Sequence, residues 1–432
     1  RPGQRHLQMA NVTFDVFVGD LARALCSGGT LVLCPRDLLL APDQLADLIH
    51  REGIDIAEFV PAVLRPLLHY LREANRRLDP LGVLICGSDS WTMQEFEQVR
   101  QLCGPETRVI NSFGVTEATI DSTWYDATTS ARSGDQGVPI GTPFTNTSVY
   151  ILDRQGQPVP VGVAGELYLG GVSLARGYLN RPELTADRFV PDPFSPTPGA
   201  RLYRTGDLAR WLPDGTIEFL GRADTQIKLR GYRIELGEIE AVLRHSPTLS
   251  EAVVMAREDT PGDLRLVAYV VPQPESTPTP RDLRSFLRSM LPEYMVPSTF
   301  ITLDQLPLTT SGKINLRALP APERGRPELE GIFAAPRTPT EQTVAALWQE
   351  VLKLDQVGID DNFFELGGHS LLATQLIARL RTTFQVDLPL RHLFTSPTIA
   401  GVAEIIDTIQ WMAQSATVPL AAVDESLEEG EL

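Results

Sequence analysis

One serine in this sequence, Ser370, stands where a nucleophile or an attachment point could act. Gly367, Gly368 and His369 precede it, and the amphipathic run Leu371–Leu380 follows it. Glycine lets the backbone turn sharply, so we expect the Ser370 hydroxyl at the mouth of a helix. A serine in that position can also be an N-cap for the first free amides of the helix. The surrounding sequence has to decide between the two roles.

The residues around Ser370 predict a small helical unit. Phe363, Phe364 and Leu366 are expected to hold the preceding loop against an apolar core. The predicted helices are Glu341–Leu354, Ser370–Arg381, a short one near Leu390–Phe394, and Thr398–Trp411. These segments predict an all-α four-helix bundle with Ser370 at the start of one helix.

Two polar clusters earlier in the chain, Gly87–Asp89 and Asn111–Glu117, lie at the predicted carboxyl ends of strands. The predicted strands are Thr30–Cys34 (expected to be buried), Ile54–Val60 and Leu81–Cys86, and the predicted helices are Pro42–Arg51, Val63–Asn75 and Met93–Leu102. This alternation favours a largely parallel sheet covered on both faces, which binds ligands beyond the carboxyl ends of its strands. Each cluster taken singly is also compatible with an ordinary polar turn.

Two further regions have different patterns. Residues 137–220 predict short strands with tight turns at Thr205–Asp207 and Pro213–Gly215. Residues 221–320 predict a small α+β unit. Its elements are a strand pair within Gly221–Gly231, a helix at Glu235–His245, strands at Glu251–Ala256 and Leu264–Val271, a helix at Arg281–Met290, and a loop that ends at Ser311–Lys313.

Composition argues against several classes of function. The 432 residues are 43% hydrophobic and 22% charged, as expected for a globular protein of about three domains. The net charge of −17 argues against nucleic acid or an anionic membrane as a partner. The sequence has no apolar run of about 18 residues, and its four cysteines show no paired spacing. We therefore expect a soluble, cytoplasmic protein with buried, reduced thiols.

A series of segments, taken in order, resembles the later core motifs of amino-acid adenylation domains of nonribosomal peptide synthetases. The segments are Phe14–Asp15, Asn111–Glu117, Gly165–Leu179, Tyr203–Leu208, Gly221–Glu240, Leu291–Pro297 and Ser311–Lys313. The stretch Asp361–Leu372 resembles the phosphopantetheine attachment site of a peptidyl carrier (thiolation) domain, and Ser370 matches the modified serine. The first resemblance runs from near residue 5 to about residue 322, and the second from about 338 to 412.

The resemblance implies a multidomain fold. A large α/β adenylation subdomain would occupy residues 1–222 and a small α+β C-terminal subdomain residues 223–322. A proline-rich linker at 323–337, an all-α four-helix-bundle carrier domain at 338–412, and an acidic tail or connector at 413–432 would follow. The glycine-rich phosphate loop that comes before Phe14 in this family is not among these residues. We therefore expect a fragment of a longer chain, and whether this piece alone is active is left open.

The resemblance also implies a chemistry that uses ATP and Mg²⁺. Adenylation joins a carboxylate to the α-phosphate of ATP, so cations must offset the negative charge on both groups. Glu117 would help to hold Mg²⁺, and Lys313 would reach the substrate carboxylate and the reacting phosphate. The implied catalytic positions are Thr116, Glu117, Asp207 and Lys313. The implied nucleotide-binding positions are Phe113, where the family usually has tyrosine, Gly114, Asp207 and Arg222.

A second half-reaction follows from the carrier resemblance. A phosphopantetheinyl transferase would place 4′-phosphopantetheine on Ser370, and its thiol would take the aminoacyl group as a thioester. Asp224 matches the hinge about which the small subdomain rotates, which would bring Gly231 and Arg233 to the site. One site would thus run two half-reactions through domain rotation. Neighbouring condensation or thioesterase domains are the implied partners, and His369 fits such a hand-over.

The implied substrate pocket contains two acidic positions. Asp15 matches the residue that pairs with the α-ammonium of an amino acid. The implied pocket positions are Asp15, Val16, Gly19, Glu58, Leu84, Cys86, Ser112, Ile120, Asp121 and Lys313. Because a buried carboxylate is costly unless it is paired, Glu58 and Asp121 predict a cationic substrate side chain. The pattern resembles ornithine-activating modules, with lysine next; the placement of Glu58 depends on an ungapped alignment through Val60 and Pro61.

Two alternatives stay open. An acyl- or aryl-acid ligase fused to a carrier would share the nucleotide motifs, but not Asp15 together with the acidic pocket. A truncated carrier fragment without adenylating activity would be modified on Ser370 without ATP-dependent loading. The sequence also leaves open the choice between ornithine, lysine and another basic amino acid.

Overall fold

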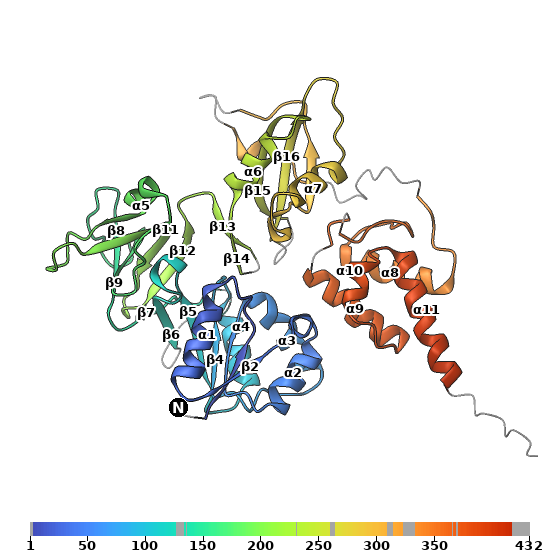
Figure 1. The fold of residues 1–432 in the computed structure, drawn as a ribbon, viewed down its shortest axis with the longest axis horizontal. Coiled ribbons are helices and arrows are strands. Elements are labelled where there is room, and N and C mark those ends of the chain that lie inside the picture. The colour runs from blue at the N-terminus through green and yellow to red at the C-terminus, as the bar shows by residue number, and fades with distance from the viewer. Residues whose placement is uncertain are drawn as a thin grey trace, which may run out of the picture. The chain divides into compact units, whose positions relative to one another are not determined.

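The computed structural model describes residues 3–126, 134, 136–229, 231–259, 264–308, 314–322, 333–364, 366–368 and 370–416. Contacts divide the chain into two units, residues 1–315 and 316–432, which are described one at a time (Figure 1). Among the predicted site residues, Lys313 and His369 lie outside the described residues, as do Ser311, Gly312 and residues 417–432. None of the described helices is long and apolar enough to cross a membrane.

The first unit begins with a seven-stranded sheet in the order β2-β1-β3-β4-β5-β6-β7 (Figure 1). The strands are β1 (Arg5–Gln8), β2 (Thr30–Leu33), β3 (Ile56–Phe59), β4 (Val83–Cys86), β5 (Arg108–Phe113), β6 (Thr123–Asp126) and β7 (Thr142–Pro143). Strands β1 to β5 pair in parallel, whereas β6 and β7 pair antiparallel. The predicted, largely parallel α/β sheet is therefore confirmed.

Helices cover both faces of this sheet. They are α1 (Asp15–Cys26), α2 (Pro42–Arg51), α3 (Pro61–Glu73) and α4 (Met93–Leu102), with 3₁₀ turns η1 (Arg36–Leu40) and η2 (Thr116–Ala118). Helices α2, α3 and α4 form one core with Leu7 of β1 and Ala57 of β3. Because side chains alternate along a strand, Glu58 lies on the opposite face, where Arg23 of α1 meets it.

The edge of the sheet differs from the prediction. A strand was predicted at Thr30–Cys34 and is present as β2, but Thr30 is exposed and Leu33 is 65% exposed. Its predicted burial is wrong, because β2 is the edge strand and pairs with β1. The thiols also differ from the prediction that they are buried: Cys86 and Cys103 are buried, but Cys26 is exposed.

A second, antiparallel sheet follows in the same unit, in the order β10-β11-β9-β8, with β12 paired to β11. Its strands are β8 (Thr147–Leu152), β9 (Gly165–Gly171), β10 (Phe189–Pro191), β11 (Arg201–Trp211) and β12 (Ile217–Arg222), with helix α5 (Pro182–Arg188) beside them. Gly215 has φ +81° in the turn between β11 and β12, a conformation that glycine adopts readily. The tight turn predicted there is confirmed, whereas the one predicted at Thr205–Asp207 is wrong, because these residues lie within β11.

The first unit ends in a smaller α+β part. Its elements are the hairpin β13 (Gln226–Leu229) and β14 (Tyr232–Glu235), helix α6 (Leu236–Arg244), the sheet of β15 (Leu249–Glu258), β16 (Leu264–Pro272) and β17 (Thr299–Thr302), helix α7 (Pro280–Arg288) and the 3₁₀ turn η3 (Glu293–Met295). Leu236, Ile239 and Leu243 on one face of α6 are buried, as the helical spacing predicts. The predicted small α+β subdomain is confirmed.

The second unit is all-α. After the turn η4 (Leu316–Ala318) it contains α8 (Pro339–Leu352), α9 (Ser370–Phe384), α10 (Arg391–Thr395) and α11 (Ile399–Ala416). Thr338 and Glu341 form a capping box that fixes the start of α8. Trp348, Phe363 and Leu376 are completely buried in its core. The helical bundle is confirmed, whereas the exact domain borders after residues 222, 322, 337 and 412 stay predictions.

Candidate active site and carrier site

The predicted amino-acid pocket lies where α1, β3 and the segment after β5 come together. Asp15 is the first residue of α1, Gly19 lies about one turn further along, and Glu58 lies on β3. A Cβ atom on Gly19 would lie 2.9 Å from Cδ1 of Ile120, so this turn of α1 closely approaches the segment after β5. These pocket positions are therefore brought together from distant parts of the sequence.

The segment that carries Ile120 has a strained backbone. Thr119 and Ile120 have φ values of +59° and +70°, which β-branched residues rarely adopt. A Cβ atom on Gly114 would lie 1.7 Å from the carbonyl oxygen of Ile120, so only glycine fits at that position. The strained turn presents Ile120 and the next residue, Asp121, toward α1.

Glu58 already has a cationic partner within the chain. Nη2 of Arg23 forms an ion pair with Glu58 and lies 2.9 Å from Oδ1 of Asp20. The side chains of Asp20 and Glu58 are each only 6% exposed. A cationic substrate is therefore not needed to pair Glu58, contrary to the argument from the sequence.

Two further carboxyl groups in the pocket have perturbed acidity. Burial raises the pKa of Asp121 to about 7, the charge of Glu58 adds to this effect, and Arg23 and a hydrogen bond from Ser112 oppose it. Burial and then the charge of Glu58 also raise the pKa of Asp20 to about 7, although Arg23 lies beside it. Within the described residues, Arg23 thus pairs with Asp20 and Glu58 and acts on Asp121 only through its charge, so the charge of the three carboxyl groups is only partly balanced.

Leu84 and Cys86 are not brought to this face of the sheet. Both are completely buried in the core with α2, α3 and α4. The residue of β4 that pairs with Glu58 is Ile85, which therefore shares its face. Val16 is half-buried on α1.

The predicted adenine-stacking residue, Phe113, ends β5 and is buried. Nζ of Lys228, on β13, lies 4.8 Å from the centre of its ring, a distance at which cation and ring attract each other. Burial lowers the pKa of Lys228, and the charge of Asp207 opposes this effect. In this conformation the ammonium group of Lys228 covers one face of the Phe113 ring.

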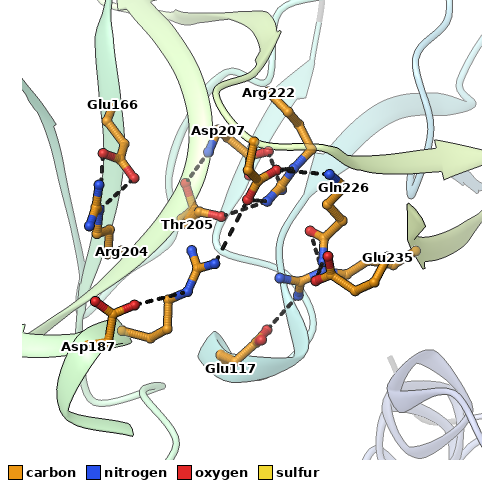
Figure 2. Close-up of polar contacts among 12 residues, drawn as sticks. Glu117, Glu166, Asp187, Arg204, Thr205, Asp207, Arg222, Gln226 and Glu235 are labelled. Atoms are coloured by element: carbon orange, nitrogen blue, oxygen red, sulfur yellow. Dashed lines mark hydrogen bonds and ion pairs between the residues drawn. The ribbon is translucent and has the colours of Figure 1, made fainter. Parts of the chain in front are cut away.

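Glu117, the predicted Mg²⁺ ligand, is held by charges and hydrogen bonds (Figure 2). Nη1 of Arg233 lies 2.8 Å from its carboxylate, and the Tyr178 hydroxyl donates a hydrogen bond of 2.7 Å. Burial raises the pKa of the Glu117 carboxyl, but Arg233, Tyr178 and Tyr203 outweigh this effect, so its pKa lies below the ordinary value. Glu117 is therefore an ionised, fixed carboxylate. Thr116, the first residue of η2, is exposed.

Asp207 is completely buried on β11 and has one oxygen to spare (Figure 2). Its Oδ1 atom lies 2.7 Å from Nη1 of Arg222, and within the described part of the chain its buried Oδ2 atom has no hydrogen-bond partner. Burial raises the pKa of Asp207, although Lys228 and Arg222 oppose this effect. A buried oxygen without a partner is costly and suits a ligand that brings its own donor. Arg222 also bonds the predicted hinge residue Asp224 at 2.7 Å.

The turn between β13 and β14 approaches the large sheet. Gly231 has φ +83°, and a Cβ atom there would lie 3.0 Å from Cγ1 of Val60, which directly follows β3. Together with the Arg233–Glu117 ion pair, this contact places the start of the small subdomain beside the predicted nucleotide site.

The carrier site is built from one short loop. Phe363 is completely buried, and its ring lies 5.0 Å from that of Trp348. The amide of Gly368 donates a 2.9 Å hydrogen bond to the Phe363 carbonyl, and a Cβ atom on Gly368 would lie 2.3 Å from the Phe363 ring. This close packing fixes the loop that leads to Ser370, the first residue of α9. The prediction that Phe363, Phe364 and Leu366 hold the loop is confirmed: Phe363 and Leu366 are buried, and the half-buried Phe364 packs against the same core.

Some residues of the site were not selected from the sequence. Arg23 follows Gly19 by four positions and Asp15 by eight, so the helical period of α1 puts all three on one side. That spacing could have been used, but α1 itself was not predicted. Tyr178 and Lys228 lie inside segments already noted for their family resemblance, Gly165–Leu179 and Gly221–Glu240.

Comparison with known families defines the class of protein. The family described as AMP-binding enzyme matches residues 1–179, and the AMP-binding enzyme C-terminal domain matches residues 238–313, together more than half of the chain. The family described as phosphopantetheine attachment site matches residues 342–406, which include Ser370. Residues 1–179 and 238–313 thus correspond to the two parts of an AMP-binding enzyme, and residues 342–406 correspond to a phosphopantetheine attachment domain.

Similar proteins narrow the class further. Gramicidin S synthase 2 from Brevibacillus brevis is 48% identical over 95% of this chain, and the dimodular nonribosomal peptide synthase of Bacillus subtilis (strain 168) is 43% identical over 91%. The matched regions span only 9% and 16% of those two proteins. This chain thus corresponds to a small part of the length of such synthases.

Two solved structures have the same arrangement of elements. Holo-PA1221, a nonribosomal peptide synthetase protein with adenylation and carrier domains, matches with a TM-score of 0.76 and 29% identity over 94% of this chain and 66% of that chain. The Vibrio cholerae adenylation domain AlmE, solved with glycyl-adenosine-5′-phosphate, matches with a TM-score of 0.63 and 30% identity over 73% of this chain and 58% of that chain. In sequence and fold the chain thus resembles the adenylation and carrier domains of nonribosomal peptide synthetases.

Proposed function

We propose that this chain activates a basic α-amino acid as its aminoacyl adenylate and transfers it to the phosphopantetheine thiol on Ser370. Ornithine is the proposed substrate, and lysine is the next candidate. The observation that carries this proposal is the set of three carboxyl groups around the pocket. In the described residues Arg23 pairs with Asp20 and Glu58, and Asp121 has no ion pair with it. A substrate ammonium group would supply the second positive charge that this set lacks.

In the first half-reaction an oxygen of the amino-acid carboxylate bonds to the α-phosphorus of ATP, and the bond to pyrophosphate breaks. Asp15 would hold the α-ammonium, and the free Oδ2 atom of Asp207 would accept hydrogen bonds from the ribose hydroxyls. Mg²⁺ binds few carboxylates together with phosphate and water oxygens, so the ionised Glu117 fits a role in holding it. The bound ion would offset charge on the phosphates. Lys313 is proposed to do the same at the reacting phosphate.

In the second half-reaction the pantetheine sulfur bonds to the aminoacyl carbonyl carbon, the bond to AMP breaks, and the thiol loses its proton. Asp224 is the proposed hinge, and Gly231 would let the pantetheine arm pass close to the backbone. The contacts of Gly231 with Val60 and of Arg233 with Glu117 support a role for this turn beside the site. A phosphopantetheinyl transferase and neighbouring condensation or thioesterase domains are the proposed partners.

The test is the intact mass of the full-length protein after phosphopantetheinylation, and again after ATP, Mg²⁺ and a mixture of amino acids are added. We expect the pantetheine gain first, and then a second gain equal to an ornithinyl or lysyl thioester. Loading of a fatty or aryl acid would favour the alternative ligase class. Pantetheine without any loading under these conditions would contradict the adenylating function and leave the carrier function intact.

The pocket assignment is tested by Asp121→Ala, which removes the carboxylate that lacks an arginine of its own. We expect ornithine-dependent pyrophosphate exchange to lose roughly 2 kcal/mol or more in transition-state binding, because a buried cation loses its partner. Exchange with uncharged norvaline should fall less. Glu58→Ala should also shift selectivity away from cationic amino acids, and the exposed Asp79 provides a control as Asp79→Ala. Unchanged ornithine preference in both pocket variants would contradict the assignment.

A further inference from the structure

Arg23 is a cation beside the predicted pocket, and the family resemblance assigns it no role. Its guanidinium lies between Asp20 and Glu58, which come from the same helix and from β3 respectively. Both carboxyl side chains are almost completely buried, whereas that of Arg23 remains 31% exposed. The arginine therefore lies at the border of the pocket, fixed on two sides by carboxylates.

The guanidinium also lies against the residues that shape the pocket. A Cβ atom on Gly19 would be 3.7 Å from Nη2 of Arg23 and 2.9 Å from Ile120. The absence of a side chain at Gly19 therefore does not leave a long open channel, because Ile120 and Arg23 lie in the space beside it. A substrate side chain that enters past Gly19 meets a positive charge.

Among the described residues, Arg23 is the cation that acts on the three carboxyl groups, and His6 adds no second charge. His6 lies on the same sheet face as Glu58 and is buried, and neither of its ring nitrogens has a hydrogen-bond partner in the described residues. Burial lowers the pKa of His6, and Arg23 lowers it further, although Asp55 opposes this effect. His6 is therefore neutral near pH 7 and leaves Arg23 as the positive charge of the cluster.

We propose that Arg23 is a specificity-determining residue that sets the length of basic side chain the pocket accepts. By holding Glu58 and Asp20 it leaves Asp121 as the carboxylate for the distal ammonium of the substrate. The guanidinium repels an ammonium group that reaches further along the pocket, so the five-carbon ornithine is favoured over the six-carbon lysine. This inference rests on the proposed function, because it assumes a basic substrate.

The wild-type full-length protein gives the first test, through pyrophosphate exchange with two series of amino acids. The charged series is 2,4-diaminobutyrate, ornithine and lysine, and the uncharged series is 2-aminobutyrate, norvaline and norleucine. We expect kcat/KM to fall roughly tenfold or more from ornithine to lysine, without an equal fall from norvaline to norleucine. A preference for lysine over ornithine, or an equal fall in both series, overturns the inference while leaving the proposed function in place.

The second test replaces the arginine. Arg23→Met keeps much of the volume without the charge, and we expect it to raise the lysine-to-ornithine ratio of kcat/KM roughly tenfold, mainly through KM. Arg23→Lys keeps a charge and should retain the preference for ornithine. The control, Arg100→Met on α4, removes an exposed arginine that also pairs with a carboxylate three residues away, Glu97.

The outcomes separate the two proposals. A purely structural role for Arg23 would lower exchange with ornithine and lysine alike and leave their ratio unchanged, which overturns the inference. If the wild-type protein activates neither ornithine nor lysine but does activate an uncharged amino acid, the proposed substrate class fails, and the inference fails with it.

Discussion

The carrier site and the amino-acid pocket are built in opposite ways. The loop before Ser370 is one continuous segment, held by apolar contacts of Phe363 and by a glycine that packs on its ring. The predicted pocket draws on α1, β3 and the strained turn after β5, where Arg23 forms ion pairs with Asp20 and Glu58. The carrier site therefore depends on packing over a few residues, and the pocket depends on where distant charged groups meet.

The two sites therefore have different structural requirements. The loop before Ser370 would act by presenting one serine, so its own stability is the main requirement. A substrate pocket must discriminate among similar amino acids, which favours buried charges that the ligand completes. Asp20 and Asp121 accordingly have raised pKa values, whereas the carrier loop relies on complete burial of the Phe363 ring.

The strongest effect is expected from a change at the carrier serine. Ser370→Ala removes the hydroxyl that would bond to phosphopantetheine, so the pantetheine mass gain and all thioester loading should disappear. Amino-acid-dependent pyrophosphate exchange should persist, because it does not use the carrier. Ser396→Ala, elsewhere in the same unit, is the control and should load normally. Pantetheine gain on Ser370→Ala would show that another residue is modified.

The next prediction concerns the packing that holds the loop. Phe363→Ala removes a completely buried ring and should lower the free energy of unfolding of the carrier unit by about 3–5 kcal/mol. Phe364→Ala, at a half-buried ring, should cost less. Hydrogen exchange of the α8 and α9 amides in the whole protein measures both. Equal effects of the two substitutions would contradict the role given to Phe363.

The same contrast explains what the sequence could predict. The carrier helices and the pinned loop follow from local patterns of apolar residues, and the predicted small subdomain follows from a helix and two clearly bounded strands. The prediction placed Pro42–Arg51 and Met93–Leu102 within the helices that form. Local periodicity is enough where neighbours in sequence are also neighbours in space.

Sequence reasoning failed where pairing between distant segments decides the outcome. The burial of Thr30 and Leu33 depends on which strand forms the edge of the sheet, and no local pattern gives that order. Glu58 seemed to need a substrate cation because its partner, Arg23, is 35 residues away in the sequence. Because α1 was not predicted, the sequence did not show that Asp15, Gly19 and Arg23 lie on the same side of one helix.

A weaker effect is expected when the pH changes the charge of the pocket carboxyl groups. Asp20 and Asp121 have raised pKa values of about 7, so both carboxyl groups become mainly ionised as the pH rises from 6 to 8. The affinity for ornithine should therefore rise by roughly tenfold over this range, since a one-unit pKa difference corresponds to a tenfold change in an equilibrium. The rise in affinity should appear as a fall in the KM for ornithine in pyrophosphate exchange. The KM for norvaline should change much less.

The stability of the ligand-free protein should change in the opposite direction. The folded state keeps protons on Asp20 and Asp121 that the unfolded chain has already lost above its pKa of about 4. The stabilisation from these protons is complete below that pKa and is lost as the pH rises through about 7. Asp121→Asn removes one of the two groups, so both pH slopes should become shallower in this variant. If Asp121→Asn keeps the full pH dependence of ornithine KM, the ionisation of Asp121 is not what the pocket uses to bind its substrate.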